Sequence, residues 1–188
     1  MRIKILLVAL VLGFAVSCGD ETLPKPAAQL ALQYKTPAYK AWSYGGCPYT
    51  FMKNTDARVE YDGNCSAILH YPKMNGALYL TYRPVEGNLR QLLGDAQKLT
   101  YEHVIKADEI FNQPYVDEMN GVYGMFYDVS GNAASQSQFY VTDSLNNFLT
   151  GSIYFNTEPN YDSILPAAAY LKKDIKRILE TLRWREKK

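Results

Sequence analysis

The chain has 188 residues, with 20 basic and 19 acidic side chains and a formal net charge of +1 at neutral pH. A near-neutral chain of this length excludes a strongly basic nucleic-acid-binding domain, because phosphate binding needs a surplus of Lys and Arg, so we expect no nucleic acid partner. Without its first 17 residues the chain keeps 171, enough for one domain with a substantial core.

Residues 1–17 are predicted to form an export signal peptide. A short leader with two basic residues precedes an apolar run over residues 5–16. This run is too short to cross a bilayer as a helix, which needs about 20 residues, but it matches the apolar region of a secretory signal. Small residues, Ala15 and Ser17, lie at positions −3 and −1 before Cys18. We therefore predict that Cys18 carries lipid and is the first mature residue; the alternative is ordinary cleavage near Ser17 that leaves a free Cys18.

The chain contains three cysteines, an odd number for an exported protein. Lipidation of Cys18 leaves Cys47 and Cys65, and we predict that these two form a disulfide in an oxidising compartment. The alternative is two buried free thiols. His70 and His103 do not lie at zinc-finger spacing from the cysteines, so no metal site and no cofactor are expected.

The mature chain is predicted to begin with a tether over residues 18–35, followed by a single domain over residues 36–188. The tether contains two prolines and mixed charges without a sustained period, which is typical of a linker. It would hold the domain close to the membrane that contains the lipid.

The first part of the domain is rich in predicted strands. Turn-forming residues separate four segments, Tyr49–Met52, Ala57–Tyr61, Ser66–Tyr71 and Ala77–Arg83. In the last segment the residues alternate, which places Leu78, Leu80 and Tyr82 on one face.

A first helix is predicted after this block. Asn88 is a candidate N-cap with Gln91 three residues later, which is close to a capping box. Apolar residues then recur at helical spacing and are expected to face the sheet: Leu89, Leu92, Leu93, Ala96 and Leu99. We expect the helix to end near Asp108.

A second block of strands follows, over Val122–Tyr127, Gln138–Thr142 and Phe148–Phe155. Asn146 and Asn147 indicate a turn between the last two strands, which are therefore predicted to form a hairpin.

The closing helix is predicted to begin near Ser163, with Pro166 tolerated in its first turn. One apolar stripe follows the helix: Ile164, Ala168, Leu171, Ile175, Ile178, Leu179 and Leu182. The order strands, helix, strands, helix predicts an α+β fold, in which two long helices pack on a largely antiparallel sheet.

The sequence contains no recognisable enzyme motif. It has no P-loop, no dinucleotide-binding glycine pattern, no zinc-protease motif and no nucleophile elbow. Glu102 and His103 are neighbours in a predicted helix and so point in different directions. We therefore predict a protein that is not an enzyme.

The segment Gly131–Thr142 is uncharged and rich in amide and small side chains. One interpretation is a loop and an edge strand whose amides bind local backbone groups. The other is a docking surface for a partner protein, in which aromatic side chains supply buried area and polar ones supply hydrogen bonds. The candidate docking residues are Asn132, Ser135, Gln136, Gln138, Phe139 and Tyr140.

Four long segments of the chain point to a family: Asp95–Asp108, Val122–Tyr127, Gly131–Ser144 and Pro159–Pro166. They resemble the corresponding segments of the GldD family of gliding-motility lipoproteins of Bacteroidota. The resemblance extends over nearly the whole mature chain, from Cys18 to Trp184.

This resemblance implies a membrane-anchored component of the gliding motility machinery, which is linked to type IX secretion. It implies lipid on Cys18, a place in the cell envelope facing the periplasm, and other gliding or secretion envelope proteins as partners. The role implied is that of a non-enzymatic accessory or scaffold protein. The alternative is a periplasmic or surface lipoprotein that binds a ligand or glycan in a cleft lined by some of the 16 tyrosines.

Overall fold

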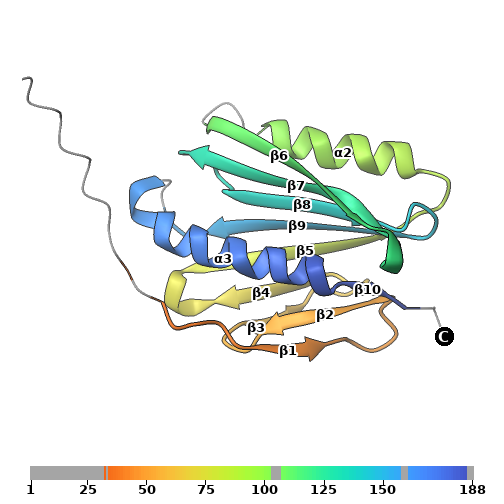
Figure 1. Cartoon of the computed structure of the whole chain (residues 1–188), viewed down its shortest axis with the longest axis horizontal. Helices are drawn as coiled ribbons and strands as arrows, with labels where there is room; N and C mark the ends of the chain where they lie inside the picture. The colour runs from red at the N-terminus through yellow and green to blue at the C-terminus, as the bar shows by residue number, and fades with distance from the viewer. Residues whose placement is uncertain (1–31, 33, 103–106, 158–160, 186–188) are drawn as a thin grey trace, which may run out of the picture.

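A seven-stranded antiparallel sheet forms the centre of the domain in the computed structural model, which describes residues 32, 34–102, 107–157 and 161–185 (Figure 1). In the order in which they pair, its strands are β3 (Arg58–Tyr61), β4 (Ala67–Tyr71), β5 (Gly76–Pro84), β9 (Asn147–Phe155), β8 (Ser137–Thr142), β7 (Val122–Gly131) and β6 (Ala107–Asp117). The α+β fold predicted from the sequence is confirmed.

The predicted strands of both blocks are present, with bounds that differ by a few residues from those expected. The predicted hairpin is also present, since β8 and β9 are antiparallel neighbours. In β5, Leu78, Leu80 and Tyr82 are buried, whereas 41% of Tyr79 is exposed on the opposite face. The alternating pattern therefore identified correctly which face of this strand belongs to the core.

A smaller sheet has the strand order β1-β2-β10, with β1 at Tyr39–Trp42, β2 at Tyr49–Asn54 and β10 at Arg183–Trp184. Its central strand therefore pairs with strands from both ends of the domain. The aromatic side chains of Tyr49 and Phe51 in β2 are fully buried in the main core.

Helix α3 (Tyr161–Thr181) lies across one face of the large sheet and beside β2 (Figure 1). All seven residues of its predicted apolar stripe are buried. The helix begins two residues before the expected start, so Pro166 lies beyond the first turn. The carboxamide oxygen of Asn132 accepts a hydrogen bond from the backbone N–H of Tyr161 at 2.9 Å. This contact stabilises the earlier start, because it pairs one of the free N–H groups at the helix N-terminus.

Helix α2 (Leu89–Glu102) packs on the opposite face, against Tyr127, Tyr140 and Phe148. It is shorter than α3, so only one of the two helices is long. Leu99 is less buried than the other residues predicted to face the sheet, since 43% of its side chain is exposed in the gap between α2 and the strands β5 and β9. Asn88 does not make the expected capping box, because its side-chain oxygen accepts from the N–H of Glu86 at 2.9 Å.

The strand β6 was not predicted, because this segment was expected to lie in and just after the first helix. The described part of the helix ends at Glu102, and Ala107–Asp117 pairs with β7 over nearly its whole length. Most β6 residues are exposed, so the apolar alternation that marks a half-buried strand is weak here.

Candidate functional site

Of the residues predicted to carry function, Cys18 lies outside the described residues, as do the signal peptide and most of the tether. Cys47 and Cys65 form a disulfide with Cα atoms 5.4 Å apart. It joins the chain just before β2 to the turn between β3 and β4. The disulfide therefore ties the small sheet to the edge of the large one.

Five of the six candidate docking residues are buried, and a partner cannot reach them on the folded domain. The side chains of Ser135, Gln136, Gln138, Phe139 and Tyr140 are all at most 9% exposed. The reason is the position of β8, which lies between β9 and β7 instead of at an edge. The docking hypothesis is therefore wrong for these five side chains.

Local hydrogen bonds account for part of this polar segment. The amide nitrogen of Gln136 donates to the carbonyl oxygen of Ala133 at 2.7 Å, and the hydroxyl of Ser135 donates to the carbonyl of Ser137 at 3.2 Å. Asn132 is the exposed member of the candidate set, and its side chain binds the N-terminus of α3. These contacts agree with the simpler interpretation, in which the amides bind nearby backbone groups.

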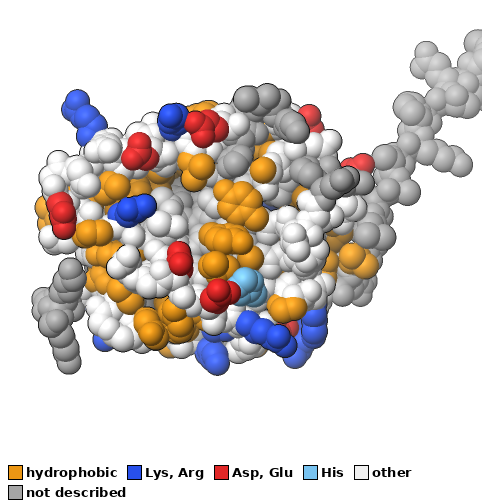
Figure 2. Space-filling model, turned by 180° about the vertical axis from the view of Figure 1, so that it is seen from behind, with side chains coloured by type: hydrophobic (Ala, Val, Ile, Leu, Met, Phe, Trp, Pro, Cys, Tyr) orange, Lys and Arg blue, Asp and Glu red, His pale blue; other side chains and the backbone are white. Residues whose placement is uncertain are grey.

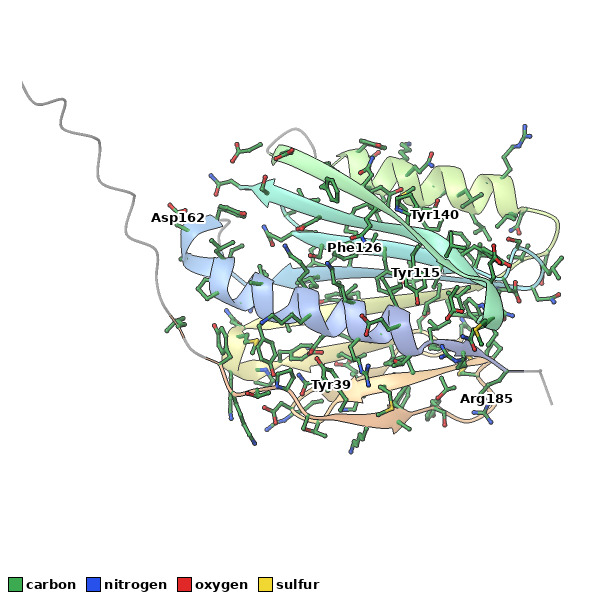
Figure 3. The ribbon with its side chains drawn as sticks, viewed as in Figure 1. Tyr39, Tyr115, Phe126, Tyr140, Asp162 and Arg185 are labelled. Atoms are coloured by element: carbon green, nitrogen blue, oxygen red, sulfur yellow. A yellow bond between two sulfur atoms is a disulfide. The ribbon has the colours of Figure 1, made fainter. Side chains whose placement is uncertain are left out.

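A buried carboxylate, that of Asp174, is the most unusual polar group in the core. Asp174 is 1% exposed and lies on the face of α3 that packs against the small sheet. The hydroxyl of Tyr39, labelled in Figure 3, donates to its Oδ1 at 2.7 Å, and the amide of Asn54 donates to its Oδ2 at 2.8 Å. The hydroxyl of Tyr170 accepts from the same Asn54 amide at 3.1 Å.

Burial raises the pKa of Asp174 above its ordinary value of 3.8, while the hydrogen bonds from Tyr39 and Asn54 act in the opposite direction. Burial, together with the hydrogen bond to Asp174, also raises the pKa of Tyr39. Since the carboxylate is enclosed and its partners are fixed, this cluster is suited to hold β1 and β2 against α3. The sequence contained a sign of it: an acidic residue interrupts the apolar stripe between Leu171 and Ile175.

The accessible candidate site is the open half of the large sheet, on the face that α2 covers only in part. Here β3, β4 and β5 have no helix over them within the described residues. Figure 2 shows this face, with a run of hydrophobic side chains and a histidine beside an acidic side chain. The Nε2 of His70 lies 2.7 Å from the carboxylate of Glu60.

Two aromatic side chains lie on this open face. The rings of Tyr79 and Tyr154 meet edge to face, with centroids 5.5 Å apart. Tyr79 comes from β5 and Tyr154 from its neighbour β9. They line a shallow pocket of about 470 Å³ together with His70, Asn75 and Asn156.

A second groove, of about 540 Å³, runs between α2 and the strands β5 and β9. The exposed Leu99 of α2 lines this groove, opposite Thr81 and Thr150. Side chains of this kind can form hydrogen bonds and apolar contacts with a bound molecule.

The tyrosines do not gather in one cleft. Many of them, such as Tyr49, Tyr71 and Tyr127, are buried in the core at separate places. Tyr44 and Tyr61 stack on each other at the surface near the disulfide, with ring centroids 3.6 Å apart. The open sheet face therefore holds only a small share of the tyrosines.

Among the residues that the structure describes, no three His, Cys, Asp or Glu side chains lie close enough together to hold a metal ion. Neither of the described helices has the length and apolarity that a membrane-crossing helix requires.

These observations define an α+β domain. The long helix α3 covers one face of its large sheet, and α2 covers only part of the opposite face. The fold of the domain is similar to the solution structure of cyanobacterial PsbP (CyanoP) from Synechocystis sp. PCC 6803, with a TM-score of 0.50 and 6% sequence identity. The similarity covers 80% of this chain and 94% of that chain, and at this identity it concerns the fold alone. No curated protein matches the chain.

The sequence pattern of one family, described as gliding motility lipoprotein GldD, matches residues 19–184. This match includes both sheets and both helices, and the chain belongs to this family of gliding motility lipoproteins. The relation that the sequence suggested is therefore confirmed, and it implies association with a membrane of the cell envelope.

Proposed function

We propose that this protein is a non-enzymatic accessory or scaffold component of the gliding machinery, linked to type IX secretion. Lipid on Cys18 holds it at a membrane, and the domain faces the periplasm and binds another envelope protein. The family match over residues 19–184 is the observation that carries this proposal. The match begins directly after Cys18, the residue to which we assign the lipid.

The surroundings of the described titratable groups support a binding role. The carboxylate with the most unusual environment, Asp174, is enclosed and hydrogen bonded on both oxygens. His70 lies on an open sheet face, where its ring is paired with Glu60. Neither group lies in a deep, water-excluding cleft, which is the usual setting for general acid–base catalysis.

A complementation experiment tests the anchoring and the role together. A strain that lacks the gene receives the wild-type chain, the Cys18→Ala variant or the matched control Ser17→Ala, which keeps a small residue before Cys18. We expect Cys18→Ala to lose labelling by a fatty-acid analogue, leave the membrane fraction and fail to restore spreading on agar and export of a type IX substrate. The Ser17→Ala variant should behave as the wild type does.

Two outcomes would contradict the proposal separately. A strain without the gene that spreads and exports normally would exclude the role in gliding and secretion. Fatty-acid labelling that persists in Cys18→Ala would exclude the assigned anchor.

The open sheet face supports a second candidate function, which is binding of a ligand or glycan. Sugars stack on exposed aromatic rings, and Tyr79 and Tyr154 supply such rings beside the amides of Asn75 and Asn156. Calorimetric titration with soluble peptidoglycan fragments tests this function. Tyr79→Ala should then abolish the heat of binding, whereas Tyr123→Ala, an exposed tyrosine on β7, should not.

A further inference from the structure

The strand β6 leaves one long edge of the large sheet open. It has 11 residues and pairs with β7 on one side only, within the described part of the chain. The edge at the other end of the sheet, β3, has only four residues. Phe111 and Val116 of β6 are each 62% exposed. A long edge with apolar side chains is a template for an added strand unless something blocks it.

The position of Pro114 indicates which residues present their backbone to the open side. Pro114 lies opposite Met125 of β7 and has no N–H to donate, so in an intact ladder its nitrogen points to the open side. The hydroxyl of Ser130 in β7 donates to the carbonyl of Glu109 at 3.5 Å, so this odd-numbered residue points to β7. Because direction alternates along a strand, the free backbone groups belong to Ile110, Asn112 and Val116.

A pocket of about 230 Å³ lies beside this edge, between β6 and α3. Tyr115 of β6 and Phe126 of β7 line it together with Leu179 of the helix, and Figure 3 labels the first two between sheet and helix. The hydroxyl of Tyr115 donates to the carbonyl of Leu179 at 2.8 Å, which fixes the distance between β6 and α3. In an added strand every second side chain points to this face, so an apolar side chain can enter the pocket.

Two charged side chains line the pocket, Lys176 and Glu180, and Glu180 is already paired with Arg177. The ammonium group of Lys176 lies 5.4 Å from the ring centroid of Phe126 and forms no ion pair with a described carboxylate. Its neighbours on the helix do form such pairs, since Lys172 binds Asp128 and Arg177 lies 3.6 Å from Glu180. A cation at the rim of an apolar pocket, without a carboxylate partner, favours an acidic group on the ligand.

We propose that β6 binds an extended segment of a partner protein by strand addition, with an apolar side chain in the pocket and an acidic side chain at Lys176. This inference deepens the proposed scaffold role, on which it rests, by stating the chemistry of the partner. A short peptide that carries these features suffices as the ligand, because the backbone of β6 supplies the remaining hydrogen bonds.

A second copy of the chain fits this edge less well. In a centred antiparallel pair of two β6 strands, Asp117 of each copy would lie opposite Ala107 and diagonal to Glu109 of the other. The acidic residues of β6 would therefore come close together at both ends of such a pair, which disfavours it, and β6 has no Lys or Arg to offset them. The partner is therefore a different protein.

The test uses the full mature chain and a phage-displayed library of random peptides about as long as β6. We expect the selected peptides to alternate in polarity and to share an apolar residue near an acidic one. Affinities of the selected peptides are then measured by fluorescence anisotropy for the wild type and four variants.

The first pair of variants examines the backbone. Asn112→Pro removes one backbone N–H donor on the open side. Asn112→Ala keeps this N–H, and both variants lose the side-chain contact with Tyr101. We expect Asn112→Pro to weaken peptide binding by about tenfold and Asn112→Ala by less than about twofold.

The second pair of variants tests the charge of Lys176. Both changes lie on α3, so they leave the backbone of β6 as it is. Lys176→Glu should lower the affinity for the acidic peptides by about tenfold. A peptide with Lys in place of its acidic residue should bind this variant with the affinity recovered. Lys173→Glu, an exposed control three residues away on α3, should bind as the wild type does.

Several results would overturn the inference. They are failure to select any peptide, equal binding to the two Asn112 variants, and unchanged binding by Lys176→Glu. Sedimentation that shows a dimer, dissociated by Asn112→Pro, would assign the edge to a second copy instead. The proposed function is tested separately, by whether a strain without the gene glides. Peptide binding therefore tests strand addition at β6, and gliding tests the role in the motility machinery.

Discussion

Replacing Tyr39 by Phe tests whether the buried carboxylate of Asp174 stabilises the junction of β1 with α3. The change removes the donor that lies 2.7 Å from Oδ1 of Asp174, while Asn54 still donates to the other oxygen. A hydrogen bond to a charged group contributes about 1.5–3 kcal/mol. Because one donor remains, we expect a loss of about 2 kcal/mol in the free energy of unfolding at neutral pH.

The loss should depend on pH, and its sign follows from the pKa of Asp174. Burial raises this pKa in the folded state, so the folded protein binds a proton more readily than the unfolded chain. Without the donor from Tyr39 the folded-state pKa rises further. The destabilisation by Tyr39→Phe is therefore largest above the folded-state pKa, where Asp174 is ionised. It decreases as the pH falls through that pKa towards the ordinary value of 3.8.

Urea unfolding followed by tryptophan fluorescence measures this effect, because Trp42 and Trp184 lie in the small sheet. With a slope of about 2 kcal/mol per molar urea, the midpoint should fall by about 1 M at about pH 8 and by less at about pH 4. Tyr34→Phe is the control, since no described group accepts a hydrogen bond from its hydroxyl. An equal loss at both pH values, or no loss at all, would refute the role assigned to Asp174.

Two further changes test the packing of the sheet and the disulfide. Gly124→Ala should lower the free energy of unfolding by about 1–3 kcal/mol, because the new Cβ would overlap the backbone carbonyl of Tyr140. Its control is Gly94→Ala in α2, where the new Cβ meets no atom and the free energy of unfolding should rise by about 0.5–1 kcal/mol. Thermal unfolding measures both, and a Gly124→Ala variant as stable as the wild type would contradict this packing. Cys47→Ser with Cys65→Ser should lower the stability by about 3 kcal/mol in denaturant titrations. A reductant should then destabilise only the wild type, and an effect on the double variant would speak against the pairing.

Local patterns predicted the elements that lie mostly inside the domain. The strands with clear alternation and the apolar stripe of α3 were found because each pattern reflects burial on one face. The strands β1, β6 and β10 were missed for a common reason. They are short or largely exposed, and β10 pairs with a strand more than a hundred residues earlier in the chain.

The position of β8 explains why the candidate docking surface was placed incorrectly. Its polar residues resembled an exposed edge, and only the pairing on both sides places Gln138 in the core. Strand order depends on contacts between distant segments, so composition alone could not reveal it. Asp174 was detectable in principle, as a charge on an apolar stripe, but its partners Tyr39 and Asn54 come from the other end of the chain.

The arrangement of β2 has a consequence for the order in which the chain folds. One edge of β2 is closed by β1, which precedes it, and the other by β10 at Arg183–Trp184. A chain that emerges from its N-terminus, during synthesis or export, thus presents an open edge on β2 until Arg183 and Trp184 have appeared. The N–H of Arg185 then donates to the carbonyl of Pro48 at 2.8 Å, next to the pairing of β10 with β2. Until β10 has paired, the open edge of β2 can pair with other strands, so the chain is open to misfolding at this edge until a late stage of folding.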